Sequence, residues 1–379
     1  MKKNFFIITY FRFQKRDYER LGIKFFKKKK NLIIIDLSRL LGNKSYQYYK
    51  KLKKKDTIEI SSFIDLIIFL RKYKASYSLV YLRSGFKELV VKFILYFFEV
   101  KIIKYLSGLK PRTEYDKIYY EKKIVDKVIL IPNIILRYIK KKIITILNYF
   151  LIHTVMITGK KSDNLEYYLN NSKRNLYSHS FDYNYYIQLN KISKNKRNVL
   201  KKKYIVYLDQ NFITHPDFFI RGEKPFVNIN FYKNLEKFFL LLKKKYKCDV
   251  KIAVHPKTDL KKLHFSLKKH CHLNKTAELI KESSHVLAHY STAISFAVLY
   301  GKSISFLTSK ELKRVRAGGQ IYNMAKILGN NIIDLDNFRS NLKINFKMNK
   351  KKYNHYVDNY IKHPNSNKEN SWKYLLKNI

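Results

Sequence analysis

The chain has 379 residues, 46 % of them hydrophobic, which is enough to build two folded domains and excludes a chain that is disordered throughout. Its 79 lysines and arginines against 28 acidic residues give a net charge of +51, so we expect its partners to be anionic. The two cysteines, Cys248 and Cys271, exclude a disulfide framework and indicate a reducing compartment.

The charge has two sources that are compatible. Lysine, asparagine, isoleucine, tyrosine and phenylalanine have AT-rich codons and are abundant, whereas glycine, proline and tryptophan are scarce, so we attribute most of the lysines to codon bias. The chain shows no zinc-finger spacing, ribonucleoprotein motif or basic heptads, and its lysines are spread along its whole length. We therefore expect no specific nucleic-acid partner and favour an anionic membrane surface.

No segment predicts a membrane span or a secretory signal. The N-terminal stretch "MKKNFFIITYFRFQKRD" lacks a small-residue cleavage site and predicts a first strand. The apolar stretch 143–159 falls short of the roughly 18 consecutive apolar residues of a spanning helix. We therefore expect a cytoplasmic protein, peripheral at the inner face of the cytoplasmic membrane.

The first half of the chain alternates between the two hydrophobic periodicities. The patterns predict strands at 5–11, 31–38, 77–84, 100–108 and 153–160, and helices at 62–73, 86–98 and over most of 126–152. Alternation of this kind indicates a parallel sheet with helices on both faces. The lysine-rich stretch 190–203 has no apolar period, and we interpret it as a linker.

The second half repeats the alternation without repeating the sequence. It predicts strands at 203–210, 248–254, 284–290 and 302–308, and helices at 228–246, 260–270, 277–283 and 291–301. The tail 351–379 predicts one or two helices. The fold class is thus α/β, with two Rossmann-like doubly wound domains; we place the first at 1–197, the second at 198–345 and C-terminal helices at 346–379.

Polar side chains follow three strands of the second half. They are Asp209 and Gln210, with His215 and Asp217 shortly after them, then His255, Pro256 and Lys257, and then His289, Tyr290, Ser291 and Thr292. Proline cannot donate to a sheet ladder, so the strand before His255 should end there. Neighbouring parallel strands would bring these groups together at one sheet edge, where open α/β sheets bind ligands.

Ser291 and Thr292 precede an apolar helical run that ends at Gly301. They occupy the positions where a helix N-cap is expected, with free main-chain N–H groups beyond it. One interpretation is plain capping by Ser291. We favour the other, a phosphate site formed by the two hydroxyls, because His289 stands two residues before Ser291.

A His-Pro pair after one strand and a Ser-Thr pair opening a later helix resemble the motifs of bacterial sialyltransferases, polysialyltransferases and capsular Kdo transferases. The glycerol-phosphate polymerases of teichoic acid synthesis carry a similar pair. The stretches "HPKTD" (255–259) and "HYSTAISFAVLYGKSISFL" (289–307) carry the resemblance, which covers about 175–310. It implies the GT-B architecture, with a central cleft between an N-terminal acceptor domain and a C-terminal donor domain, and C-terminal helices that cross back to the first domain.

The resemblance also implies roles for residues. His255, with Pro256 and Lys257 beside it, would contact the donor phosphate, and Ser291 with Thr292 would do the same from a helix N-terminus. Glu278 would bind ribose hydroxyls, and Gln210 and His289 would complete the nucleotide site. The acidic triplet that supplies the general base in sialyltransferases is missing here. Asp209 and Asp217 in the second half, and Glu114 and Asp116 in the first, are the candidates that remain.

These expectations predict a metal-independent nucleotide-sugar glycosyltransferase without a resident cofactor. It would transfer a sugar, such as CMP-activated sialic acid or Kdo, to a capsule, lipopolysaccharide or O-antigen glycan. Two alternatives remain open: a transferase of polyol phosphate from a CDP-activated donor, and a non-catalytic scaffold that binds anions or polysaccharide.

Overall fold

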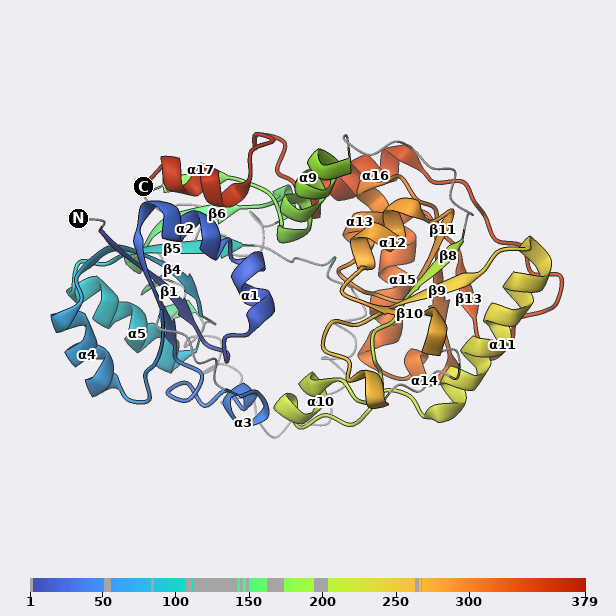
Figure 1. Ribbon diagram of the computed structural model, residues 1–379, viewed down its shortest axis with the longest axis horizontal. Coiled ribbons are helices and arrows are strands. Elements are labelled where there is room, and N and C mark those ends of the chain that lie inside the picture. Colours follow the sequence, from blue (N-terminus) through green and yellow to red (C-terminus); the bar gives the residue numbers. More distant parts are fainter. Residues whose placement is uncertain are drawn as a thin grey trace. The chain divides into compact units, whose positions relative to one another are not determined.

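The computed structural model describes residues 3–50, 56–82, 85–106, 111, 142–143, 146–147, 150–161, 174–193, 204–262, 266 and 268–379. The chain divides into two compact units, which are described separately. Unit 1 comprises 1–109, 128–181 and 362–379, and unit 2 comprises 110–127 and 182–361. Figure 1 shows a sheet with flanking helices in each.

Unit 1 is built on a parallel sheet in the order β3-β2-β1-β4-β5-β6-β7. Its strands are β1 (Asn4–Thr9), β2 (Asn31–Asp36), β3 (Thr57–Glu59), β4 (Ala75–Tyr81), β5 (Lys101–Leu106), β6 (Ile152–Ile157) and β7 (Arg174–Tyr177). The central strands read as continuous apolar runs because both faces of the sheet are covered. From β1 the chain adds β2 and β3 on one side and then β4 to β7 on the other, which is characteristic of a doubly wound sheet.

Helices cover both faces of this sheet (Figure 1). They are α1 (Lys15–Arg20), α2 (Ile23–Lys29), α3 (Ser45–Tyr48), α4 (Phe63–Lys72), α5 (Phe86–Phe97) and α17 (Ser371–Lys377). One core cluster joins α4 and α5 to the sheet, and a second joins α2 and α17 to it from the other side. Ser62 caps α4 by accepting the Asp65 N–H at 3.0 Å.

Unit 2 is built on a parallel sheet in the order β10-β9-β8-β11-β12-β13. Its strands are β8 (Ile205–Leu208), β9 (Val250–Val254), β10 (Cys271–Leu273), β11 (His285–Ala288), β12 (Ile304–Thr308) and β13 (Ile332–Asp334). Within the unit this is the 3-2-1-4-5-6 order of the Rossmann fold. The predicted fold class, two Rossmann-like α/β domains, is therefore confirmed.

The helices of unit 2 are α9 (Phe181–Ser193), which enters it at Asp182, α10 (Pro216–Arg221), α11 (Ile229–Tyr246), α12 (Thr276–Glu282), α13 (Ile294–Leu299), α14 (Lys310–Lys313), α15 (Arg316–Leu328) and α16 (Lys350–Tyr356). A π-helical turn, Val357–Ile361, follows α16. They enclose one core cluster around β8 and β11. Asn228 caps α11 at its start, and Lys247 ends it with a φ of 50°.

The predicted helix at 260–270 is wrong in the described part of that segment. Two 3₁₀ turns, Leu260–Lys262 and Lys268–His270, stand there instead, and the short edge strand β10 follows. Leu260, the leucine of this stretch that the structure describes, is exposed and so does not contribute to a buried helical face.

The C-terminal residues divide between the units. Those up to 361 belong to unit 2, whereas 362–379 pack in unit 1, where Trp372 is buried and its indole N–H donates to the Arg20 carbonyl at 3.2 Å. The predicted boundary at 197 lies among residues outside the described part and stays a prediction. Among the helices described, none has the length and apolar character to cross a bilayer.

Candidate functional site

The strand order of unit 2 creates a switch point between β8 and β11. These neighbouring strands send their connections in opposite directions, and open α/β sheets bind ligands at the carboxyl ends of such a pair of strands. Gln210, after β8, accepts the main-chain N–H of Tyr290, after β11, at 2.9 Å. The side chain of Gln210 thus joins the two loops that follow these strands.

His255 follows β9 and is held by its own turn. Its Nδ1 accepts the main-chain N–H of Lys257 at 3.2 Å, and its carbonyl accepts the Thr258 N–H at 2.8 Å. Pro256 has no N–H of its own, so the turn is closed by the two residues after it. Because Nδ1 is the acceptor, the proton of the neutral ring resides on Nε2, which makes His255 an Nε2–H donor.

His215 forms a second His-Pro turn beside the first. Its Nδ1 accepts the Asp217 N–H at 3.1 Å, in the same pattern as His255, and so caps α10. The two imidazole rings lie with their centroids 4.5 Å apart. The sequence places His215 among the polar residues that follow β8 but assigns it no role in the site. The signal was present, because "THPD" repeats the His-Pro-polar order of "VHPK".

An ion pair connects the two turns. Lys257 Nζ donates to Asp217 Oδ1 at 2.7 Å, and Asp217 Oδ1 also lies 3.7 Å from His215 Nδ1. Burial opposes ionisation of Asp217, but the hydrogen bond and charge of Lys257 outweigh it and hold the pKa of this carboxyl below its usual range. The carboxylate therefore remains charged at neutral pH and fixes both turns.

Asp209 lies beneath this edge. It is 5 % exposed, and its carboxylate accepts the main-chain N–H of Asn211 at 3.1 Å and those of His255 and Gln210. Burial raises its pKa to about 6, against the lowering effect of these hydrogen bonds. Asp209 thus holds the main chain at the start of the His255 turn, which is a positioning role.

Three buried polar atoms near this edge have no hydrogen-bond partner in the described part of the chain: Asn211 Nδ2, Thr258 Oγ1 and Glu278 Oε2. Asn211 also has a φ of 48°, an uncommon backbone conformation for a residue other than glycine. Glu278 lies in the first turn of α12, and its other oxygen, Oε1, accepts the Tyr185 hydroxyl at 2.7 Å. Buried polar atoms normally pair, so these atoms are available to a polar ligand.

His289 is part of the core. It is fully buried, with Nδ1 bonded to the Leu307 carbonyl at 2.7 Å and Nε2 to the Tyr207 hydroxyl at 3.0 Å. Burial lowers its pKa to about 4, so the ring is neutral. Both nitrogens are used within unit 2, and we leave His289 out of the site.

Ser291 and Thr292 precede α13, which begins at Ile294 rather than at Ser291. Ser291 Oγ accepts the Ala293 N–H at 3.2 Å, and Thr292 is exposed in the turn that leads into the helix. Gly301 ends the helix with a φ of 62°, in the left-handed conformation expected of it. Phosphate binding by the two hydroxyls stays a prediction.

An Asp-x-Asp run, which in other proteins is suited to a divalent cation, ends β13 at Asp334 and Asp336. Here Asp334 pairs with Lys313 Nζ at 2.5 Å, and Asp336 accepts the Lys310 N–H at 2.6 Å. In the described residues, no group of three His, Cys, Asp or Glu side chains is arranged to hold a metal ion. These two carboxylates thus support α14.

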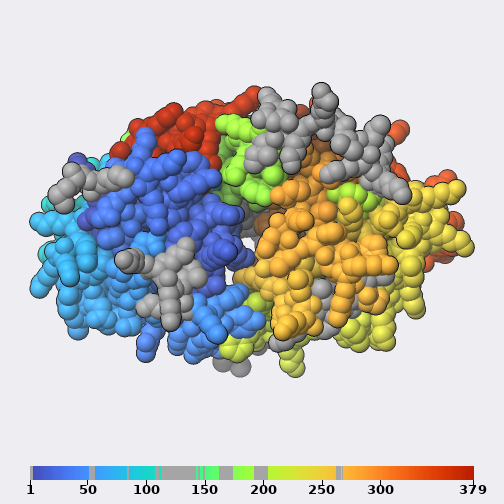
Figure 2. Space-filling view, viewed as in Figure 1, coloured from blue at the N-terminus to red at the C-terminus, as the bar shows by residue number. Residues whose placement is uncertain are grey.

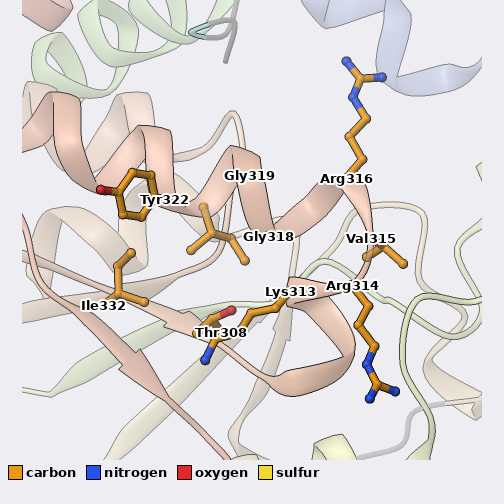
Figure 3. Close-up of a pocket in the computed structure, with 10 residues that line it drawn as sticks. Thr308, Lys313, Arg314, Val315, Arg316, Gly318, Gly319, Tyr322 and Ile332 are labelled. Atoms are coloured by element: carbon orange, nitrogen blue, oxygen red, sulfur yellow. The ribbon is translucent and has the colours of Figure 1, made fainter. Parts of the chain in front are cut away.

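A cavity of about 390 Å³ lies at the start of α15 (Figure 3). Figure 3 shows Arg314 and Arg316 extending in opposite directions from the segment before this helix. Apolar side chains, including Val315 and Ile332, line much of it. None of the predicted site residues lines this cavity. Glu114 and Asp116, the candidate bases of the first half, lie outside the described residues.

Comparison with known proteins gives likeness in structure only. No family model and no curated protein matches the sequence. Three similar structures are the UDP-GlcNAc 2-epimerase of Methanocaldococcus jannaschii (TM-score 0.45, 14 % identity, 94 % of this chain and 98 % of that one), MurG of Acinetobacter baumannii (0.46, 7 %, 100 % and 99 %) and the calicheamicin glycosyltransferase (0.44, 7 %, 90 % and 87 %). Likeness at this level does not extend to a shared site or activity.

Proposed function

We propose that the protein is a glycosyltransferase that moves a sugar from a nucleotide donor to a capsule, lipopolysaccharide or O-antigen glycan. The donor we propose is a CMP-activated acidic sugar such as sialic acid or Kdo. The observation that carries the proposal is the pair of His-Pro turns, which fixes His215 and His255 side by side at the carboxyl edge of a Rossmann-like sheet.

The pair of imidazoles suits a departing phosphate. When the bond from the sugar carbon to the phosphate oxygen breaks, its electron pair stays on that oxygen, and the acceptor hydroxyl forms the new bond and loses its proton. Donors held at Nε2 by the two turns stabilise the negative charge that develops on the phosphate. A protonated imidazole can also donate its proton to the leaving group.

The other residues support this arrangement. Asp209 and the ion pair of Lys257 with Asp217 hold the imidazoles in place. The free oxygen of Glu278 suits a ribose hydroxyl. We propose that Ser291 and Thr292 contact the same phosphate, that no metal ion takes part, and that the general base comes from unit 1, where Asp116 is the candidate.

We also propose that the protein works at the inner face of the cytoplasmic membrane, where lipid-linked acceptors are found. Its net charge of +51 supports attraction to anionic lipids and glycans. In the GT-B arrangement implied by the motifs, unit 2 would bind the donor and unit 1 the acceptor.

Thermal unfolding with CMP, CDP, UDP and GDP tests the proposal. We expect one nucleotide to raise the Tm of the wild-type protein, and His255→Ala and His215→Ala each to reduce that shift at least several-fold. His355→Ala, on the exposed face of α16, is the matched control and should leave the shift unchanged. Pyrophosphate at equal ionic strength corrects for non-specific anion binding. A wild-type protein that no nucleotide stabilises would favour the non-catalytic scaffold.

The polyol-phosphate alternative requires a different product. A CDP-activated donor would release CMP and leave its second phosphorus atom in the polymer, whereas a CMP-sugar leaves no phosphorus in the glycan. Phosphorus analysis of the product therefore separates the two reactions.

A further inference from the structure

One side of unit 1 exposes large apolar side chains on two helices. They come from α4 and α5, and we call them the apolar face: Ile64, Ile68, Phe86, Phe93, Tyr96 and Phe97. Phe97 is 82 % exposed, Ile64 68 % and Phe86 63 %. Single exposed apolar residues are common, but a concentration of them indicates an interaction surface.

The exposure follows the helical period. On α5, Phe86, Phe93 and Phe97 lie on one stripe, and the opposite stripe packs into the core through Val91 and Leu95. A surface helix normally places polar residues on its outer stripe. The outer stripe of α5 instead carries aromatic rings, so it is built to contact something other than water.

α4 and α5 belong to one face of the sheet. α4 and α5 pack on the same core cluster and lie near each other in Figure 1. α5 connects β4 to its parallel neighbour β5. The light-blue atoms of the α4–α5 region form part of the surface in Figure 2.

Basic side chains border the apolar face. Arg71, Lys72 and Lys74 are exposed at the end of α4, and Lys101 is exposed where β5 starts after α5. Lys87 is also exposed, whereas the acidic residues of these helices and their ends are Asp65 and Glu99, which are exposed, and Glu88, which is half-buried. The centres of protein interfaces are depleted of lysine. Aromatic and aliphatic side chains ringed by lysines are instead suited to an anionic bilayer surface.

We propose that the apolar face docks on anionic lipid, with Phe93 and Phe97 inserted at the level of the headgroups and the basic residues in contact with lipid phosphates. This inference does not depend on the reaction at the His-Pro turns. It names the surface of unit 1 that contacts the membrane and adds an apolar contribution to binding. The net charge alone would not favour one part of the chain over another as the contact surface.

Sedimentation with vesicles tests the proposal. We expect binding to phosphatidylglycerol-containing vesicles, part of which persists at about 1 M salt, where the Debye length is only ~3 Å. The double substitution Phe93→Ser with Phe97→Ser should reduce vesicle binding at about 1 M salt at least tenfold. The matched control, Phe219→Ser with Leu240→Ser, changes exposed apolar residues of unit 2 and should bind like the wild type. Arg71, Lys72 and Lys74 changed to Gln should weaken binding at low salt.

Insertion has its own readout. In Phe97→Trp the new indole should shift to the blue with anionic vesicles and be quenched by brominated lipid, whereas Trp372 is buried. Equal salt-resistant binding by the Phe93→Ser, Phe97→Ser protein would overturn the proposal. So would a wild-type dimer that these substitutions dissociate without lipid, because a second copy would then cover the face. Nucleotide stabilisation should be unaffected, which separates this test from that of the transferase.

Discussion

At the scale of single residues, the His-Pro turn is a local device. His215 and His255 accept an N–H from the residue two positions on, and His363 in unit 1 accepts that of Asn365 in the same way. The sequence thus predicts each turn. It does not predict that the first two rings lie 4.5 Å apart, because β8 and β9 pair only in the folded sheet.

The opposite case is His289, which the sequence places at a strand end beside the proposed site. Its ring lies in the core because the Leu307 carbonyl and the Tyr207 hydroxyl satisfy both nitrogens there. His285, earlier on β11, is similar, with its nitrogens bonded to Ser303 at 2.7 Å and Ser305 at 2.9 Å. Burial lowers the pKa of His285 to about 3 and that of His289 to about 4.

These histidines predict that unit 2 loses stability in acid. In the unfolded chain the two imidazoles bind protons near pH 6.5, whereas in the folded chain they do so only near pH 3 to 4. Between pH 7.5 and 5, each imidazole therefore lowers the free energy of unfolding by about 2 kcal/mol. Asp209, whose pKa is raised to about 6, acts in the opposite direction and raises the free energy of unfolding by about 1.5 kcal/mol over the same pH range. Acid should therefore destabilise the unit in net terms.

Urea unfolding followed by far-UV circular dichroism measures this dependence. His285→Gln should reduce the change between pH 7.5 and 5 by about 2 kcal/mol, because one titrating group is removed. An unchanged slope would show that His285 does not titrate on unfolding.

At the scale of elements, long amphipathic patterns were predicted well and short polar elements were not. α11 runs over Ile229–Tyr246, close to the predicted 228–246, because its apolar stripe packs on the core. β10 has three residues at a sheet edge, too few for a periodic signal. α13 starts after Ser291 because that hydroxyl caps a turn first.

The packing of α14 against α15 depends on Gly318. A Cβ at this position would lie 2.7 Å from both the Leu312 carbonyl oxygen and the Lys313 Cα. Because these are backbone atoms, Gly318→Ala should force the helices apart and cost about 1–3 kcal/mol. Gly222→Ala offers a comparison, since its Cβ meets nothing within 4 Å and only its φ of 66° opposes the change. Equal losses of Tm in the two variants would contradict this account.

At the scale of the whole molecule, unit 1 is closed by the last residues of the chain. Trp372 packs on Phe26 and Tyr105, and a Cβ on Gly22 would lie 2.1 Å from its ring. Residues from the two ends of the chain thus share one core cluster. The periodicity of the tail predicts a helix, whereas the unit on which it packs is implied only by the resemblance of the motifs.

Trp372→Ala should therefore destabilise unit 1 by about 3–5 kcal/mol and leave unit 2 nearly unchanged. Native-state hydrogen exchange can follow the units separately. Protection should fall in β1 and β2 and persist in β8 and β11. Equal loss of protection in all four strands would show that the two units unfold together.

The sequence by itself determined the α/β class, most of the strands of both sheets and the His-Pro turns, because these depend on periodicity and on contacts between near neighbours in the chain. Tertiary structure alone decided the strand order, the pairing of His215 with His255, the burial of His289 and the side of unit 1 that exposes its aromatic residues. These features depend on which distant segments pack together, and a single sequence does not record that choice.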